Sequence, residues 1–318
     1  MTRFYFFGGK GGVGKTTVSA AVAVQSADAG NRTLLVPTDP AHSTADVFDQ
    51  AFGNEPVSVE GISDLWALEI DPEAELEEHM LEIKRAMTEQ VSATIVNELD
   101  SHIEMAHQTP GAYEAALFDR VIEVMRESDD FDRVVFDTSP TGATLRLLSL
   151  PKHLESWIER LEEKRARSLK LFEYMALGEE RREAERRTQE DPIINRLRER
   201  KEMFEFAGEV LRNEAEFYLV MNPDLLSIKE TDRAIATLAE SGLTVSGLVV
   251  NRVSPAPDPE NGGRGGDYLR EKHRTERERV DTIQESFDEP VVGIIETQPR
   301  EITGTTLRSI HDDLDILG

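Results

Sequence analysis

The chain has 318 residues, a length that suits one large domain or one domain with a substantial insertion. Its 36 Lys and Arg face 62 Asp and Glu, a net charge of −26, so we expect no general affinity for nucleic acid or for an anionic membrane surface. Cysteine is absent, which excludes disulfides and thiolate zinc sites.

The ratio of Arg to Lys and the lengths of the apolar runs bear on the kind of organism and the cell compartment that we expect for the protein. Arg outnumbers Lys by 27 to 9, and an acidic, lysine-poor, cysteine-free surface resembles that of proteins from salt-loving microbes, in which dense salt screens self-repulsion. No apolar run reaches the roughly 18 residues of a transmembrane helix, and the N-terminus has no charged region followed by a cleavable apolar stretch. We therefore expect a soluble, cytoplasmic protein.

The first thirty residues predict a strand, a glycine-rich loop and a helix, in that order. Arg3–Phe7 is apolar like a buried strand, and Thr16–Ala29 is small and helix-compatible, with Gly30 placed to end the helix. The loop between them fits the phosphate-binding pattern Gly-x4-Gly-Lys-Thr, and it reads Gly9-Lys10-Gly11-Gly12-Val13-Gly14-Lys15-Thr16-Thr17. Backbone N–H groups of such a loop close around phosphate oxygens at a helix N-terminus, so the sequence predicts a nucleoside triphosphate site.

Three side chains of this loop carry chemistry. Lys15 can reach the β- and γ-phosphates, and the Thr16 hydroxyl can ligate Mg²⁺. Lys10 has no task in the basic pattern. A lysine on the outer side of the loop suits a charge that is delivered across a dimer interface to the nucleotide of the partner, in the manner of an arginine finger.

The next predicted strand, Thr33–Val36, leads into the polar segment Asp39–Asp46. A carboxylate at the carboxyl end of a strand lies on the ligand side of such a sheet, so Asp39 can orient or deprotonate the attacking water and contribute to the Mg²⁺ site through water. For His42 and Asp46, a functional role and simple turn chemistry both remain open.

After the predicted strand Leu65–Ile70, residues 71–127 are acidic and helical in pattern, and residues 151–214 repeat that character farther along the chain. Both connections are much longer than a crossover between parallel strands needs, so we expect them to form one helical subdomain beside the sheet. The predicted core then comprises residues 1–70, 128–150 and 215–318. Six methionines lie in the two inserts, where they suit either an adaptable binding surface or ordinary core packing: Met80, Met87, Met105, Met125, Met175 and Met203.

Between the inserts, the apolar run Arg133–Phe136 ends in Asp137, and Asp137–Thr144 reads Asp-Thr-Ser-Pro-Thr-Gly-Ala-Thr. An Asp that ends a buried strand fits the Walker B role of holding Mg²⁺ through water. The Pro–Thr–Gly turn after it can carry the status of the γ-phosphate into the helix that begins near Thr144.

The last third of the chain predicts further strands, a helix, a loop and residues that can bind the base. After the strand Phe217–Met221, Ser227-x-x-Glu230 predicts a helix start through a capping box, and Gly242 predicts its end. Asn251 follows the strand Val245–Val250, where its amide can pair with the N6/N7 edge of adenine or serve as a plain turn residue. Asp258–Asp267 predicts a flexible loop. After the strand Pro290–Ile295, three residues can offer backbone groups to the base: Gln298, Pro299 and Arg300.

Continuous rather than alternating hydrophobicity in these strands predicts a mostly parallel sheet, flanked by helices on both faces, which is an α/β fold of the P-loop NTPase kind with an inserted α-helical subdomain. Over nearly its whole length, the chain resembles the family of arsenite-pump ATPases and tail-anchored-protein-targeting ATPases, a deviant branch of P-loop ATPases. The resemblance rests on the following segments: Gly9–Thr17, Asp39–Asp46, Asp137–Leu148, Pro223–Arg233, Asn251, Pro110–Ala112 and Pro299–Gly304.

The resemblance implies a homodimer that closes around two ATP·Mg²⁺, with Lys10 as the signature lysine, Asp39 as the catalytic carboxylate of switch I and Asp137 at the start of switch II. The helical inserts would form the surface for a client or partner.

Three functions follow as alternatives. The leading one is an ATP-driven chaperone that shields a hydrophobic helix of a membrane protein and hands it to a membrane receptor. The others are the ATPase subunit of an arsenite or anion pump and a regulatory switch of the septum-positioning or partition type.

Departures from the family pattern bear on this choice. Switch II has Ser139 and Ala143 where the family usually has alanine and histidine, so a signalling role of that histidine is lost. Gly263 and Gly266 stand at the spacing of the Cys-x-x-Cys pair that binds zinc in the targeting branch, so we expect no zinc and a dimer that depends on nucleotide. The pump branch binds arsenite or antimonite through thiolates, and this chain has none.

Overall fold

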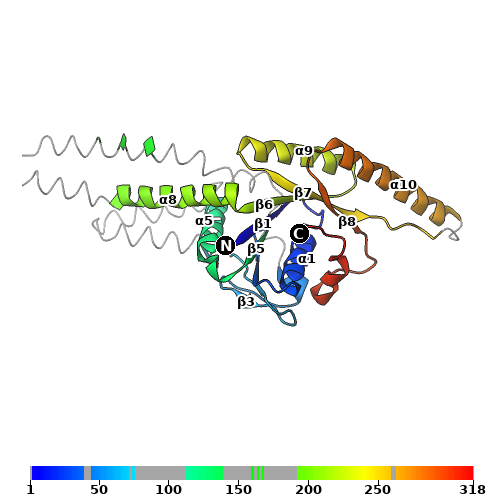
Figure 1. Ribbon diagram of the computed structural model, residues 1–318, viewed down its shortest axis with the longest axis horizontal. Coiled ribbons are helices and arrows are strands. Elements are labelled where there is room, and N and C mark those ends of the chain that lie inside the picture. The colour runs from blue at the N-terminus through cyan, green and yellow to red at the C-terminus, as the bar shows by residue number, and fades with distance from the viewer. Residues whose placement is uncertain are drawn as a thin grey trace, which may run out of the picture.

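The computed structural model describes residues 2–38, 44–71, 74–75, 112–138, 159–160, 163–164, 167, 192–258 and 263–317. These residues form eight strands, labelled as in Figure 1: β1 Arg3–Gly8, β2 Thr33–Pro37, β3 Val57–Ser58, β4 Leu65–Ala67, β5 Arg133–Asp137, β6 Ala215–Met221, β7 Val245–Val253 and β8 Val291–Glu296. The helices among them are α1 Lys15–Asp28, α2 Thr44–Phe48, α5 Ala112–Glu127, α8 Pro192–Asn213, α9 Leu225–Glu240 and α10 Gly263–Ser286, with short 3₁₀ segments η1 Ser128–Asp130 and η2 Gly304–Ile310.

The strands form one sheet in the order β3-β4-β2-β5-β1-β6-β7-β8. Every pairing is parallel except that of β3 with β4 at the edge. The prediction of a mostly parallel sheet flanked by helices is therefore confirmed. The sequence missed β3, which has only two residues, and the strand predicted over Leu65–Ile70 is shorter than expected.

The central strand β1 shows why both sheet faces are apolar. Successive side chains of a strand point to opposite faces, so Phe4 and Phe6 enter one core cluster while Tyr5 and Phe7 enter the other. The Phe6 ring stacks on Phe136 of β5, with centroids 4.6 Å apart. A strand buried on both sides has no polar face, which accounts for the unbroken apolar run at the N-terminus.

Helix α1 covers one face of the sheet together with η2, seen in blue and red in Figure 1. Its side chains are small, and Ala20, Ala21 and Ala23 have no exposed surface, so the helix backbone lies close to the strands. It ends as predicted just before Gly30, whose φ of 86° continues the chain in the left-handed region.

Four longer helices contribute to the core on the other face: α5, α8, α9 and α10. In Figure 1, α9 and α10 lie above the sheet, while α5 and α8 lie toward the end opposite α10. These helices bury fewer, larger side chains, such as Phe118 of α5 stacked on Phe204 of α8 with centroids 6.1 Å apart. Of the six methionines in the predicted inserts, the structure describes Met125 and Met203, and both pack in this core rather than on a binding surface.

Two predicted helix boundaries are wrong. Helix α9 begins at Leu225, because Asp224 rather than Ser227 caps it: the Asp224 carboxylate accepts hydrogen bonds from the backbone N–H groups of Leu226 and Ser227. Helix α10 begins at Gly263, inside the predicted loop Asp258–Asp267. Gly266 is buried in that helix, so tertiary packing outweighs the low helix propensity of glycine.

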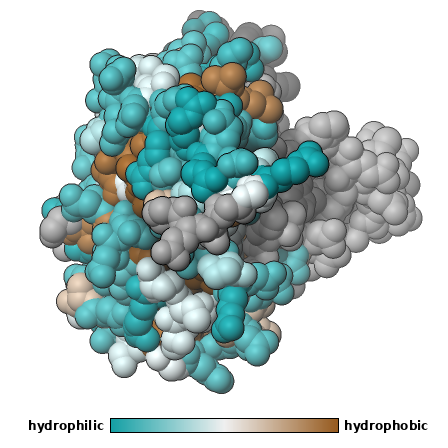
Figure 2. All heavy atoms as spheres, turned by 90° about the vertical axis from the view of Figure 1, so that its right-hand side faces the viewer, coloured by the Kyte–Doolittle hydropathy of each residue, from teal (hydrophilic) through white to brown (hydrophobic). Residues whose placement is uncertain are grey.

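The surface is predominantly hydrophilic. Figure 2 shows this on the face at the α10 end of the molecule, where hydrophobic residues gather in small separate areas. Large apolar side chains that are more than half exposed include Leu225 and Leu226 at the start of α9 and Tyr268 of α10. Among the residues that the structure describes, no helix has the length and apolar character needed to cross a membrane.

Candidate nucleotide site

The loop between β1 and α1 is shaped by glycines at which any other residue would be strained. A Cβ atom on Gly9, whose φ is 139°, would lie 2.2 Å from the backbone oxygen of Val220 in β6. A Cβ atom on Gly14, whose φ is 94°, would lie 2.3 Å from Nδ2 of Asn251. Both glycines therefore adopt backbone conformations that side chains rarely allow, and they let the loop approach the ends of β6 and β7.

Lys15 is the first residue of α1, and its side chain is only 4% exposed. Its Nζ donates a hydrogen bond of 3.4 Å to the backbone oxygen of Lys10, which also accepts from the N–H of Val13 at 3.4 Å. The ammonium group thus lies against the inside of its own loop, at the N-terminus of a helix. Cation, helix dipole and backbone N–H groups together make this position attractive to phosphate.

Lys10, which the sequence predicts on the outer side of the loop, forms an ion pair in its own chain. Its Nζ is 3.5 Å from the Glu230 carboxylate of α9, and both side chains are 36% exposed. Burial alone would raise the pKa of the nearby Asp224, but hydrogen bonds from Ser227 and from the N–H of Leu226, with the positive charge of Lys10, lower it. The sequence suggested Glu230 only as part of a helix cap and gave no sign of this ion pair.

Asp137 lies where the sequence places it, at the carboxyl end of β5, beside Phe7 of β1. Its side chain is 1% exposed, and its backbone oxygen accepts hydrogen bonds from the N–H and the hydroxyl of Thr38 at 2.8 and 3.1 Å. The ends of β2, β5 and β1 are therefore joined next to the phosphate loop. The predicted catalytic carboxylate Asp39, along with His42, lies outside the described residues, and so do Ser139 and Ala143 of switch II.

Asn251 ends up in contact with the phosphate loop. Its Nδ2 donates a hydrogen bond of 2.7 Å to the backbone oxygen of Val13, and its Oδ1 accepts one of 2.8 Å from the N–H of Arg252. Arg252 has a φ of 60°, in the left-handed region, at an irregularity in the pairing of β7 with β8. An asparagine amide has two N–H donors and two lone pairs on its oxygen, so the bonds to described residues leave one of each, and the two bonds fix the orientation of the amide.

A pocket of about 510 Å³ adjoins the loop and Asn251, at the carboxyl ends of β7 and β8. This size suits a nucleoside. The residues lining it include Gly14, Thr16, Thr17, Asp46, Val47, Asn251, Arg252, Thr297, Gln298 and Arg300. The structure therefore brings together the phosphate loop, Asn251, Gln298 and Arg300, which the sequence predicted separately, whereas Pro299 is not among the lining residues.

The sequence gave no clear indication that Arg252 and residues of α2 line the pocket. The sequence left Asp46 open between turn chemistry and function, and it gave no reason to single out Arg252 apart from its place beside Asn251. Arg252 enters because the irregular end of β7 turns its backbone into the left-handed region. Single-residue deviations of this kind depend on tertiary contacts, which periodicity along the chain does not report.

Comparison with known proteins gives a consistent answer. A family described as "Anion-transporting ATPase" matches residues 2–315. A "Putative arsenical pump-driving ATPase 2" of Aquifex aeolicus is 30% identical over 303 residues, which cover 95% of each chain. A "Putative arsenical pump-driving ATPase" of Halobacterium salinarum is 33% identical over 310 residues, 97% of this chain but 43% of that longer protein. The "ATPase GET3A" of Arabidopsis thaliana is 30% identical over 307 residues, 95% of this chain and 80% of that one.

Proposed function

The chain belongs to the family of anion-transporting ATPases and is an ATPase, and from this premise we propose that it acts as a Mg²⁺-dependent homodimer that binds and delivers hydrophobic membrane proteins. The observation that carries the proposal is the phosphate loop, with Lys15 folded inside it and Lys10 on its outer side. The first lysine serves the nucleotide of its own chain. The second would serve the nucleotide of a partner.

The residues present fit ATP·Mg²⁺. The N–H groups of the loop and Lys15 would hold the phosphates, and the fixed amide of Asn251 has one donor and one acceptor left for the N7 and N6 positions of adenine. The Thr16 hydroxyl and the buried Asp137 carboxylate are hard oxygen ligands at adjacent strand and helix ends, the type that Mg²⁺ prefers. Bound Mg²⁺ would neutralise charge on the phosphate oxygens.

Hydrolysis needs a positioned water and a compensating charge more than covalent chemistry. Asp39, next to Thr38 at the end of β2, would orient the water and accept its proton. Lys10 would leave Glu230 and contact the phosphates of the partner chain as two copies close, so that hydrolysis and dimer closure depend on each other.

The choice of a hydrophobic client over an anion rests on the chemistry of the ligands. Arsenite and antimonite bind to soft thiolates, and the chain has no cysteine, so the pump alternative lacks its ligands. The switch alternative would be favoured by an amphipathic segment for the membrane surface. In the segment that includes η2, the apolar side chains of Leu307, Ile310 and Leu314 are buried in the α1 core and are therefore not presented to lipid.

The predicted helical inserts, residues 71–127 and 151–214, supply the proposed client surface. A fluorescent twenty-residue Leu/Ala peptide tests this role, with and without a non-hydrolysable ATP analogue and Mg²⁺ in high salt. We expect the peptide to bind in a nucleotide-dependent manner, and we expect ATP hydrolysis to be unchanged by antimonite. Stimulation of hydrolysis by antimonite without any capture of the peptide would favour the pump alternative.

The catalytic assignment has its own test. Asp39→Asn removes the proton acceptor but keeps the side-chain shape, so kcat should fall by on the order of 10²–10⁴ while the Kd of ATP stays within about threefold. Single-turnover hydrolysis and equilibrium binding of a fluorescent ATP analogue measure the two quantities. Near-normal turnover of Asp39→Asn would show that another group activates the water.

A further inference from the structure

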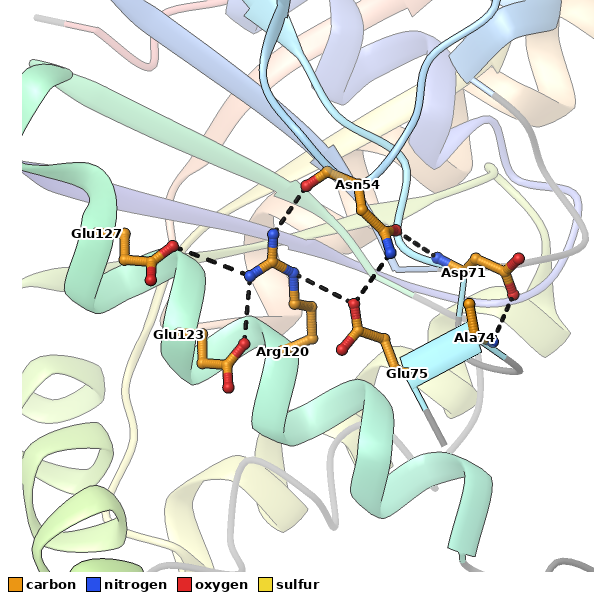
Figure 3. Close-up of polar contacts among 7 residues, drawn as sticks. All are labelled: Asn54, Asp71, Ala74, Glu75, Arg120, Glu123 and Glu127. Carbon is orange, nitrogen blue, oxygen red and sulfur yellow. Dashed lines mark hydrogen bonds and ion pairs between the residues drawn. The ribbon is translucent and has the colours of Figure 1, made fainter. Parts of the chain in front are cut away.

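Arg120, in the middle of α5, lies away from the nucleotide pocket and joins three separate segments (Figure 3). Its side chain is only 12% exposed. Nη2 donates a hydrogen bond of 2.7 Å to the backbone oxygen of Asn54, and Nε is 3.5 Å from Oε1 of Glu75. Nη1 is 3.2 Å from Glu123 and 3.9 Å from Glu127, one turn and two turns along the same helix.

Asn54 holds the same segment from a second side. Its Nδ2 donates to Oε1 of Glu75 at 3.2 Å, and its Oδ1 accepts from the N–H of Asp71 at 3.1 Å. We call Asn54, Asp71, Glu75 and Arg120 the Arg120 clasp. One guanidinium faces three glutamates, so without it the carboxylates would repel one another, and Glu75 would lose its ion pair with α5.

The clasp is connected to the wall of the nucleotide pocket. Asp46 and Val47 of α2 line that pocket, and Asn54 lies only six residues after the end of α2. The chain between them is braced: the N–H of Gln50 donates to the backbone oxygen of Ala45 at 3.3 Å, and the Phe48 and Phe52 rings meet edge to face with centroids 6.3 Å apart. A displacement of α2 would therefore move Asn54, and with it the contact to Arg120.

On its other side, α5 is tied to α8. Asp119, next to Arg120 in the chain, forms an ion pair of 2.5 Å with Arg200. Phe118 stacks on Phe204 of the same helix. Three consecutive residues of α5 thus contact the segment that leads from the pocket wall and helix α8, which falls within the second predicted insert.

We propose that Arg120 is a positioning residue that couples the α2 wall of the nucleotide pocket to helices α5 and α8, which fall within the two predicted helical inserts. This inference rests on the proposed function, because it assigns a route by which nucleotide occupancy reaches the client surface. Arg120 contacts no nucleotide. Its role is to keep Asn54 and Glu75 attached to α5, so that the pocket wall and the inserts move as one unit.

Amide hydrogen exchange followed by mass spectrometry tests the coupling in the 318-residue chain, with and without a non-hydrolysable ATP analogue and Mg²⁺. In the wild type, the analogue should slow exchange in the phosphate loop and change it in α5 and α8 by at least about fivefold. Arg120→Gln should keep the protection of the loop and lose the change in α5 and α8. Glu123→Gln is the matched control, because it removes a partner of Arg120 within α5 and leaves the contacts to Asn54 and Glu75 intact.

The outcomes separate this inference from the proposed function. Wild-type coupling in Arg120→Gln would overturn the role of Arg120, as would a wild-type protein whose loop is protected while α5 and α8 do not respond. A wild-type loop that is not protected would contradict nucleotide binding itself. If Arg120→Gln does not fold, Glu75→Gln weakens the same link from the other side, and it should reduce the change in α5 and α8 while Glu123→Gln does not.

Discussion

The two faces of the sheet are built in different ways. The α1 face is a close contact of small side chains, in which alanines with no exposed surface bring the helix backbone onto the strands. The opposite face is covered by longer helices that meet through large rings and ion pairs, such as Phe118 on Phe204 and Asp119 with Arg200. The proposed phosphate site lies at the N-terminus of α1, whereas α5 and α8, which fall within the predicted inserts, contribute to the other face.

The two faces suit two different requirements, one for a phosphate site and one for a client surface. A phosphate site must keep its N–H groups fixed, and a helix packed closely through alanines has little room to shift. A client surface must change with the state of the nucleotide, and polar contacts between helices can rearrange at lower cost than a core of interlocked apolar side chains. The Arg120 clasp connects the two, since it joins the pocket wall to the second face.

Among the substitutions that compare the two faces, the largest effect is expected on the α1 face. Lys15→Ala removes the buried ammonium from the phosphate loop, and hydrolysis should fall by on the order of 10²–10³ because transition-state charge loses its compensation. Lys201→Ala on α8 is the matched control, since this lysine pairs with Glu159 and Glu205 far from the pocket. Steady-state ATPase assays compare the two variants. An equal loss of ATPase activity in both would contradict the assignment of phosphate binding to the α1 face.

A core truncation on the other face should affect stability without affecting the nucleotide. Phe204→Ala leaves a cavity beside Phe118, so the free energy of unfolding should fall by about 3 kcal/mol, while the Kd of ATP stays unchanged. Urea denaturation and nucleotide titration measure the two quantities. A large rise in the Kd would mean that the phosphate site depends on α8 as closely as on α1.

Asn251, near the carboxyl end of β7, should determine which purine the nucleotide pocket binds. Asn251→Asp puts an oxygen opposite the backbone oxygen of Val13, so we expect about a tenfold loss of ATP affinity, roughly 1.4 kcal/mol, and a smaller preference for ATP over GTP. Competition binding of the two nucleotides measures this preference. Thr297→Ala, at a lining position of the same pocket, is the control, and equal effects of both substitutions would argue against a fixed amide as the selector.

The smallest effect concerns an ion pair that attaches η2 to the end of α1. The hydrogen bond from Arg308 lowers the pKa of Asp28 below its ordinary value of 3.8, so the pair stabilises the fold above that pH and loses its contribution as the pH falls through the lowered pKa. Arg308→Ala should cost about 0.5–1 kcal/mol at pH 7 and progressively less as the pH falls through the lowered pKa of Asp28. Chemical denaturation over a series of acidic pH values checks this, and a cost that does not decline with pH would indicate lost packing instead.

Much of the fold followed from local pattern. Apolar runs predicted the parallel strands, and the glycine pattern predicted the phosphate loop, because burial on both faces and phosphate binding each impose requirements on consecutive residues. The predicted cap at Ser227 and the predicted loop Asp258–Asp267 were wrong: Asp224, one turn before Ser227, caps α9, and tertiary packing holds glycines in α10.

Individual residues of the candidate site were predictable from the sequence, but the contacts that these residues make were not. Lys10, Asn251 and Asp137 could be singled out from motif and strand end, but their partners could not. Glu230 reaches Lys10 from 220 positions away, and Val13 meets Asn251 from a distant part of the chain. The Arg120 clasp has no sequence signature at all, because arginine among glutamates on an acidic chain is ordinary until the fold buries it.

The central claim, that nucleotide closes two copies of the chain through Lys10, is tested most directly by the molar mass in solution. Light scattering in high salt should report a monomer without nucleotide and a dimer with a non-hydrolysable ATP analogue and Mg²⁺, and Lys10→Ala should stay monomeric while it still binds the analogue. A mass that ignores the nucleotide, or a Lys10→Ala variant that dimerises normally, would contradict the account.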